Sequence, residues 1–172
     1  MLTEKLNTKE LFASFDDTAS ELLQVVSSFN EKEINTAPFK DSWTAAQVAE
    51  HVTRSNNSII KSLELQGETT ERNPAEGAEG LKKTFLDFTT KLKSPKFILP
   101  TQSTYSKEMI IADLKKSLER LKEVRDPATL SEVINHPVFG DVTKLELLYF
   151  VMYHTQRHIH QLKNIFKKLD NE

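Results

Sequence analysis

Three of the five histidines in the chain fall at positions where a helical pattern turns them towards a protein core. His154 and His158 lie four residues apart in the string HTQRH, so their side chains project from one helix face, a single turn apart. His51 lies on the apolar line of another predicted helix. Imidazole nitrogens bind metal ions at about 2.0–2.1 Å, and three of them leave a coordination position open for water or substrate. The pattern is therefore typical of a catalytic metal site at His51, His154 and His158.

The same pattern has a plainer interpretation, because an HxxxH pair occurs by chance and buried histidines are often held by a carbonyl or hydroxyl group. Other metal sites fit worse. A metalloprotease helix needs Glu directly after the first histidine, where this chain has Thr155. A ferritin-like di-iron site needs Glu three residues before a histidine, and no histidine here has it. We expect His160 to be solvent-exposed and without a role, and the loop residue His136 either to border a pocket mouth or to bond locally.

Few other residues offer chemistry. With no cysteine, the chain has no disulfide, no thiolate ligand and no cysteine nucleophile, so any catalysis is expected at the open side of a metal ion. Trp43 is predicted to pack at the start of a helix, where its indole N–H needs a partner. The spacing leaves open whether four polar residues contact substrate or only solvent. They are Glu50, Asn56, Asn57 and Arg157.

The elements that must position the histidines are helices. Apolar residues recur with a helical period in four long segments, and two of these begin with a capping-box pattern, Thr44 with Gln47 and Thr143 with Glu146. The sequence predicts an all-α four-helix bundle that forms a single domain over residues 1–172, with a short extra helix between helices two and three. The long helices are predicted at 8–29, 44–66, 106–126 and from 143 to the C-terminus, and the short one at 81–92.

The connections are predicted to be irregular. Residues 67–80 hold three of the four glycines and are expected to form an exposed, mobile loop, with Gly67 as a helix C-cap. Residues 127–142 are expected to form a structured loop at most. The loops at 67–80 and 94–105 are expected to shape any pocket.

Composition narrows the partners and the compartment. Lys and Arg total 23 against 25 Asp and Glu, which leaves a net charge of −2 and no electrostatic footprint for nucleic acid or an anionic membrane. The longest apolar run, Leu147 to Tyr153, is too short to span a bilayer, and the N-terminus lacks the apolar stretch of a signal peptide. We therefore expect a cytoplasmic protein.

Three stretches carry a further resemblance: SWTAAQVAEHV, which contains Trp43 and His51, HPVFGDVT, which begins at His136, and YHTQRHIHQL, which contains His154 and His158. Together they resemble the DinB-like (DinB/YfiT) superfamily of four-helix-bundle metalloproteins. The resemblance implies that one histidine of the second helix and the HxxxH pair of the last helix bind a divalent metal ion. His51, His154 and His158 occupy those three places. Nitrogen ligands suit borderline ions, so Zn or Ni is expected.

Members of this family include S-transferases that act on the thiols bacillithiol, mycothiol or glutathione. The resemblance therefore implies a metal-dependent thiol S-transferase, in which the ion lowers the pKa of a small thiol and the thiolate attacks an electrophilic substrate. A metal-dependent hydrolase is one alternative, and a non-catalytic metal-binding stress-response protein is another. The family resemblance also implies a homodimer.

Overall fold

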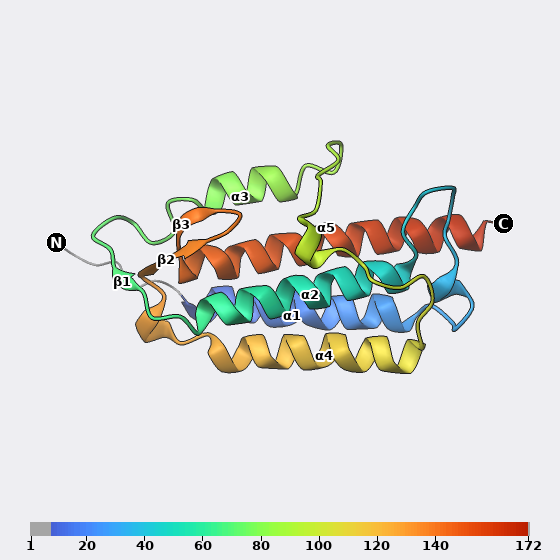
Figure 1. Ribbon diagram of the computed structural model, residues 1–172, viewed down its shortest axis with the longest axis horizontal. Coiled ribbons are helices and arrows are strands. Elements are labelled where there is room, and N and C mark those ends of the chain that lie inside the picture. The colour runs from blue at the N-terminus through green and yellow to red at the C-terminus, as the bar shows by residue number, and fades with distance from the viewer. Residues whose placement is uncertain (1–7, 172) are drawn as a thin grey trace.

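Four long helices run side by side in the computed structural model, which describes residues 8–171 (Figure 1). The prediction of a four-helix bundle with a short extra helix between its second and third long helices is confirmed. The short helix, α3, packs against the outer side of α5. The helices are α1 Thr8–Ser27, α2 Ala45–Leu63, α3 Ala78–Phe85, α4 Lys107–Val124 and α5 Lys144–Asp170, and the 3₁₀ turns are Glu33–Asn35, Lys96–Ile98 and Pro127–Thr129.

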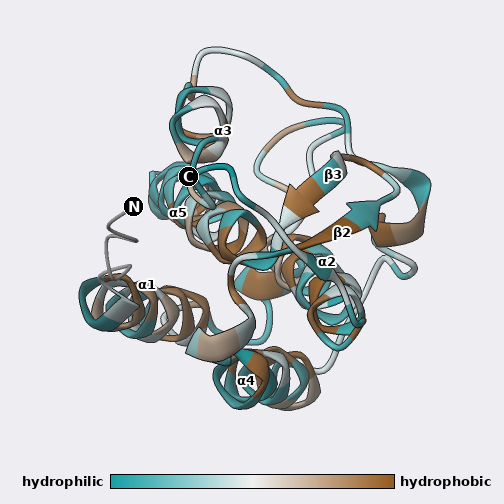
Figure 2. Cartoon of the chain, turned by 90° about the vertical axis from the view of Figure 1, so that its left-hand side faces the viewer, coloured by the Kyte–Doolittle hydropathy of each residue, from teal (hydrophilic) through white to brown (hydrophobic). Residues whose placement is uncertain are grey.

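The inner faces of the long helices form the core. Their apolar residues pack into one buried core, and Figure 2 shows brown, hydrophobic stretches of ribbon on the sides of the helices that face one another. Leu22 in α1, Val52 in α2 and Leu162 in α5 are fully buried, and Leu118 in α4 is nearly so. Burial of such a side chain contributes roughly 1.5–3 kcal/mol, so these lines hold the bundle together. Within residues 8–171, no helix combines the length and apolar character that crossing a membrane requires.

The predicted capping boxes set where α2 and α5 begin. The Thr44 hydroxyl accepts a hydrogen bond from the Gln47 N–H at 3.1 Å, and the Gln47 side-chain oxygen accepts one from the Thr44 N–H at 3.0 Å. Thr143 and Glu146 make the same pair of bonds at the start of α5. Each box satisfies N–H groups that have no partner inside the helix, so these two starts could be predicted.

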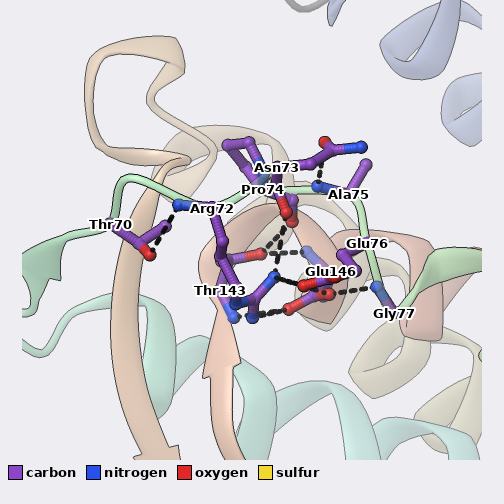
Figure 3. A network of polar contacts seen from close by, with 9 residues as sticks. All are labelled: Thr70, Arg72, Asn73, Pro74, Ala75, Glu76, Gly77, Thr143 and Glu146. Carbon is purple, nitrogen blue, oxygen red and sulfur yellow. Dashed lines mark hydrogen bonds and ion pairs between the residues drawn. The ribbon is translucent and has the colours of Figure 1, made fainter.

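Glu146 does more than complete a capping box (Figure 3). Its carboxylate is buried and also accepts hydrogen bonds from the Gly77 N–H and from the Arg72 guanidinium, at 2.6 Å for the closer nitrogen. The Thr143 hydroxyl donates to the Pro74 carbonyl at 2.5 Å. These contacts tie the connection before α3 to the first turn of α5.

A small antiparallel sheet replaces the predicted loop at 127–142, so that prediction is wrong. Its strands are β1 Glu68–Thr69, β2 Glu132–His136 and β3 Gly140–Thr143, in the order β1-β2-β3. The buried side chains of Ile134 and Val142 face each other across the β2–β3 hairpin. Gly140 has a φ of 67°, a left-handed conformation that glycine adopts without strain. β1 has two residues and pairs with a distant segment, so no local pattern indicated it, whereas β2 and β3 pair locally around Pro137 and Gly140, which were interpreted as loop residues.

The predicted loop at 67–80 is also corrected, because it contains β1 and the start of α3. Gly67 is not the C-cap of α2; Glu64 is. A Cβ atom on Gly67 would lie 2.5 Å from the Val133 carbonyl oxygen, so glycine allows the chain to pass close to β2.

The short helix ends at Phe85, not at the predicted residue 92. Beyond it the Asp87 carboxylate accepts hydrogen bonds from the Thr89 N–H at 3.0 Å and from the hydroxyls of Thr89 and Thr90 at 2.6 and 2.7 Å. Such side-chain bonds offer the backbone an alternative to the helix. The apolar spacing at Phe88 and Leu92 was therefore misread as a continuation of the helix.

Candidate metal centre

The bundle brings the three predicted histidines together. His51 comes from α2, and His154 and His158 from the facing α5. The Nε2 atom of His154 lies 3.1 Å from Nε2 of His51 and 3.1 Å from Nε2 of His158. All three side chains are buried, and each offers one nitrogen within 4.8 Å of the other two.

Two of the three separations between these nitrogens match those expected around a common metal ion. Four ligands at about 2.0–2.1 Å in a tetrahedron lie roughly 3.3 Å from one another. The observed separation of 3.1 Å between Nε2 atoms is close to that spacing. The rings of His154 and His158 also pack edge to face, with 4.5 Å between their centroids. The cluster in the described chain contains three histidines and no carboxylate, so a bound ion would keep an open side.

Two of the rings have their hydrogen fixed by an oxygen on the far side. His51 donates from Nδ1 to the Ile98 carbonyl at 2.8 Å, and His158 donates from Nδ1 to the Gln161 side-chain oxygen at 2.7 Å. Because a carbonyl oxygen only accepts, each Nδ1 carries the hydrogen and each Nε2 carries a lone pair. Bonds of this kind orient histidine ligands and make them more basic.

Counting hydrogens shows that the cluster is not satisfied by itself. With neutral rings, Nε2 of His51 and Nε2 of His158 are both acceptors, and His154 can donate from Nε2 to only one of them. At least one of the two 3.1 Å contacts therefore has no hydrogen between its two nitrogens, and the inward lone pair of that outer ring has no donor. A cation between the nitrogens would give each of the three a favourable contact.

Electrostatics keeps the rings neutral. Burial lowers the pKa of His51, and burial together with the neighbouring histidines lowers the pKa of His154 well below its ordinary value. The pKa of His158 falls to about 3, chiefly through burial. Neutral imidazole is the form that ligates a metal, so the cluster is in this form at pH 7.

A cavity of about 230 Å³ adjoins the three histidines. Its walls are mainly apolar and come from α2, α3, α5, residues 92–98 and the β2–β3 turn. The prediction that residues 94–105 shape the pocket holds for their first part, whereas no residue of 67–80 lines it. The apolar wall residues include Ile59, Phe85, Leu92, Phe97, Phe139 and Phe150.

Three α2 side chains, of which only Glu50 was named as a candidate from the sequence, hold the segment over the cluster. Glu50 accepts hydrogen bonds from the Thr101 N–H at 2.9 Å and from the Tyr105 hydroxyl, and Arg54 donates to the Phe97 carbonyl at 2.8 Å. Gln47 donates to the backbone of residue 102 at 3.0 Å. These bonds fix the segment whose Ile98 carbonyl orients His51. Their spacing of three and four residues along one helix stripe was the signal that sequence reasoning missed.

Other predicted residues have structural roles. Trp43 packs on the His51 ring with 5.1 Å between ring centroids, as expected of a packing residue. Asn56 is buried and donates to the Ser117 hydroxyl at 3.1 Å, which joins α2 to α4. Asn57 is exposed, as a solvated residue would be.

The remaining candidates lie on α5 and on β2. Arg157 lines the cavity, and its guanidinium donates to three backbone carbonyls between residues 85 and 90, so it anchors the chain after α3. His160 is exposed, as predicted, and stacks on Phe88 with 4.0 Å between ring centroids. His136 is buried, lines the cavity and also accepts local hydrogen bonds from the Val138 and Phe139 N–H groups, so both interpretations that the sequence left open hold.

Fold and cluster together define a class of protein: a four-helix bundle whose second and last long helices hold three buried histidines against a small cavity. The sequence model of the DinB superfamily matches residues 14–162, most of the chain, so the chain belongs to the DinB superfamily. The uncharacterized protein YuaE of Bacillus subtilis (strain 168) is 23% identical over 168 residues, which cover 91% of this chain and 97% of YuaE.

Solved structures share the fold. YfiT from Bacillus subtilis, described as a probable metal-dependent hydrolase with an unusual four-helix bundle topology, is 15% identical with a TM-score of 0.59, covering 99% of this chain and 90% of YfiT. A conserved protein from Enterococcus faecalis is 14% identical with a TM-score of 0.64, covering 96% and 98%. The four-helix bundle protein TT2238 is 19% identical with a TM-score of 0.58, covering 91% and 98%. At these identities the likeness establishes the fold alone.

Proposed function

We propose that this chain is a metal-dependent enzyme that holds one divalent ion, Zn or Ni, on the Nε2 atoms of His51, His154 and His158. The observation that carries the proposal is that, at two 3.1 Å contacts, the rings supply at most one hydrogen for two inward lone pairs, and a cation would satisfy all three nitrogens. A site with only a structural role normally closes with four protein ligands, whereas the described cluster has three and opens on a cavity.

The reaction we propose is transfer of a low-molecular-weight thiol to an electrophilic substrate. A bound ion would supply positive charge that lowers the pKa of a thiol at its open side. The chain's own residues prepare the place. Ile98 and Gln161 hold two imidazoles with the lone pair inward, and three neutral rings leave the ion's charge undiminished. Apolar walls such as Phe85 and Phe150 exclude water and receive the electrophile.

Hydrolysis is the second candidate, since the open side of the same ion would activate water. YfiT, whose fold is similar, is described as a probable metal-dependent hydrolase. A non-catalytic metal-binding stress-response protein is the third, and the cavity beside the histidines argues against it. The homodimer and the cytoplasmic location stay predictions.

Metal content is tested first. Protein purified without a His-tag should contain about one divalent ion per chain by elemental analysis, and His51→Ala, His154→Ala and His158→Ala should each lose it. His160→Ala, which removes an exposed histidine from the same helix, is the matched control and should keep it. If all three cluster variants retain full metal content, the assignment of ligands is wrong.

Activity is tested with several small thiols and the electrophile monochlorobimane, using metal-free and reconstituted protein side by side. We expect conjugation only with the reconstituted protein, and we expect His158→Ala to lose the rate while its unfolding temperature stays the same. An equal rate with and without metal contradicts the transferase. If ester or amide probes are turned over and no thiol is transferred, the chain is a hydrolase and not a transferase.

A further inference from the structure

His136 carries a hydrogen-bond donor that the fold does not use. The residue ends β2 and is only 4% exposed. Its Nδ1 atom accepts hydrogen bonds from the Val138 N–H at 3.1 Å and the Phe139 N–H at 3.4 Å. Because both partners are donors, Nδ1 carries a lone pair, and the ring's hydrogen is on Nε2. Burial lowers the pKa of His136 below its ordinary value, so the ring is neutral at pH 7 with this single hydrogen.

The Nε2 atom is buried and has no hydrogen-bond partner among the described residues. Leaving a buried donor without a partner costs about 1–3 kcal/mol. The turn itself does not require imidazole, since the side-chain oxygen of Asn or Asp accepts the same two N–H groups in an Asx turn. The ring therefore adds a donor that destabilises the fold, a feature that calls for a functional explanation.

The His136 ring belongs to the cavity beside the histidine cluster. It is one of the cavity's lining residues, and it stacks on Phe139 with 5.0 Å between ring centroids. Phe139 packs on Phe150 at 4.9 Å, and Phe150 stacks on His154 at 5.0 Å. A continuous wall of rings thus joins the unused donor to the candidate metal centre.

The chemistry of this wall selects a class of ligand. A neutral donor on a residue that lines a mainly apolar cavity suits a neutral acceptor oxygen on a mainly apolar molecule, because a carboxylate would lose its hydration there. The two cations of the lining do not change this, since the Arg157 guanidinium is occupied by backbone carbonyls and Lys93 is exposed to solvent. A cavity of about 230 Å³ admits a small molecule of this kind.

We propose that His136 is a substrate-binding residue whose Nε2–H donates a hydrogen bond to the carbonyl oxygen of the electrophile. The proposal deepens the proposed function, because it assigns a place in the cavity and a chemical class to the electrophilic partner. The same hydrogen bond would serve the electrophile of a thiol transferase and the ester or amide substrate of a hydrolase.

Two substitutions separate the roles of the two ring nitrogens. In His136→Asn the side-chain oxygen can take the place of Nδ1 and accept from the Val138 N–H, but nothing takes the place of Nε2–H. In His136→Gln the longer side chain can present an N–H near the position of Nε2, but the acceptor for the turn is lost. If His136 serves only the turn, Asn is the conservative replacement. If it serves a ligand, Gln is.

The probes are acetophenone and ethylbenzene, which share size and shape but differ in the carbonyl oxygen. Binding is measured without any thiol, by amide chemical shifts of Val138 and Phe139, on the protein as purified and after addition of Zn. From wild type to His136→Asn, we expect the preference for acetophenone over ethylbenzene to fall about three- to tenfold, the size of one neutral hydrogen bond, and we expect His136→Gln to retain it.

A preference that is unchanged in His136→Asn overturns the proposal, and so does the failure of both probes to shift the wild-type amides. Because the measurement needs neither thiol nor turnover, it can succeed where the S-transferase assay fails. A second readout needs no ligand at all. Long-range ¹H–¹⁵N spectra of the imidazoles should show the hydrogen of His136 on Nε2, and a hydrogen on Nδ1 contradicts the proposal.

Discussion

Two buried polar clusters lie along α5, and they are built in opposite ways. At the start of the helix, the Glu146 carboxylate accepts from the N–H groups of Thr143 and Gly77 and from Arg72, whose charge is opposite to its own. Two to three turns further on, His154 faces two histidines whose inward nitrogens are both acceptors. The first cluster is complete within the chain. In the second, the hydrogens of the chain do not satisfy every inward nitrogen, so the contrast separates groups that hold the fold from groups that suit a ligand.

The largest effect should come from breaking the complete cluster. Glu146→Ala removes an acceptor from two backbone N–H groups and leaves the Arg72 guanidinium, 32% exposed, without its main partner. We expect the free energy of unfolding in urea to fall by about 3 kcal/mol, as for a broken buried pair. Glu76→Ala is the control, because Glu76 is exposed and lies 3.7 Å from the same guanidinium. It should change stability by less than about 0.5 kcal/mol, and equal effects of both variants would remove the distinction.

The histidine cluster should respond in metal affinity instead. Gln161→Leu removes the oxygen that fixes the hydrogen of His158 on Nδ1. Loss of such a partner typically lowers metal affinity ten- to a hundredfold, about 1.4–2.8 kcal/mol, and competition with a chromophoric chelator measures it. Gln156→Leu is the matched control: on the same helix, its amide reaches the Thr18 hydroxyl at 3.5 Å rather than a histidine. Unchanged affinity in Gln161→Leu would show that His158 does not depend on this bond.

Acid sharpens the comparison through Glu146. Burial opposes ionisation of this carboxyl, but the hydrogen bonds from Arg72, Thr143 and Gly77 outweigh burial and lower its pKa below the ordinary value. A depressed pKa gives stability that is present above the unfolded-state pKa, near 4.3, and is lost as the pH falls through the folded-state value. The stability difference between wild type and Glu146→Gln should therefore be constant from pH 7 to about 5 and shrink below that. Urea titrations at several pH values test this, and a difference that grows in acid contradicts it.

The two clusters also show how much a sequence discloses. The Thr143–Glu146 box and the HxxxH pair were both visible, because each depends on positions three or four residues apart on one helix. The helical period of α2 also placed His51 on the core-facing side, so the four helices and the histidine cluster could be predicted from the sequence. In each cluster, the residues that lie close together on one helix could be predicted.

The partners that come from distant segments of the chain could not be predicted. Arg72 and Gly77 reach Glu146 from a connection that looked like an exposed loop, and the donors gathered there have no shared spacing. The β1–β2 part of the sheet arises from pairing between Thr69 and Glu132, which are far apart in the sequence. His136 could be identified as a loop histidine, but only its two backbone donors show which of its nitrogens is unused. Contacts between distant segments leave no period in a single sequence.

The smallest expected effect is the most direct test of the contrast. His154→Phe replaces the central imidazole with an apolar ring in a setting that already suits one, because Phe150 stacks on this position at 5.0 Å and Phe85 meets it edge-on at 6.0 Å. The variant loses at most one N–H···N hydrogen bond and also removes a nitrogen–nitrogen contact that has no hydrogen in it. In the presence of EDTA, its free energy of unfolding in urea should therefore lie within about 1 kcal/mol of the metal-free wild type, while its metal content falls to zero. Groups kept for a ligand behave in this way, since their removal costs function more than stability. A loss of about 3 kcal/mol in the metal-free variant would instead place the histidines with Glu146, as a network that holds the helices together without an ion.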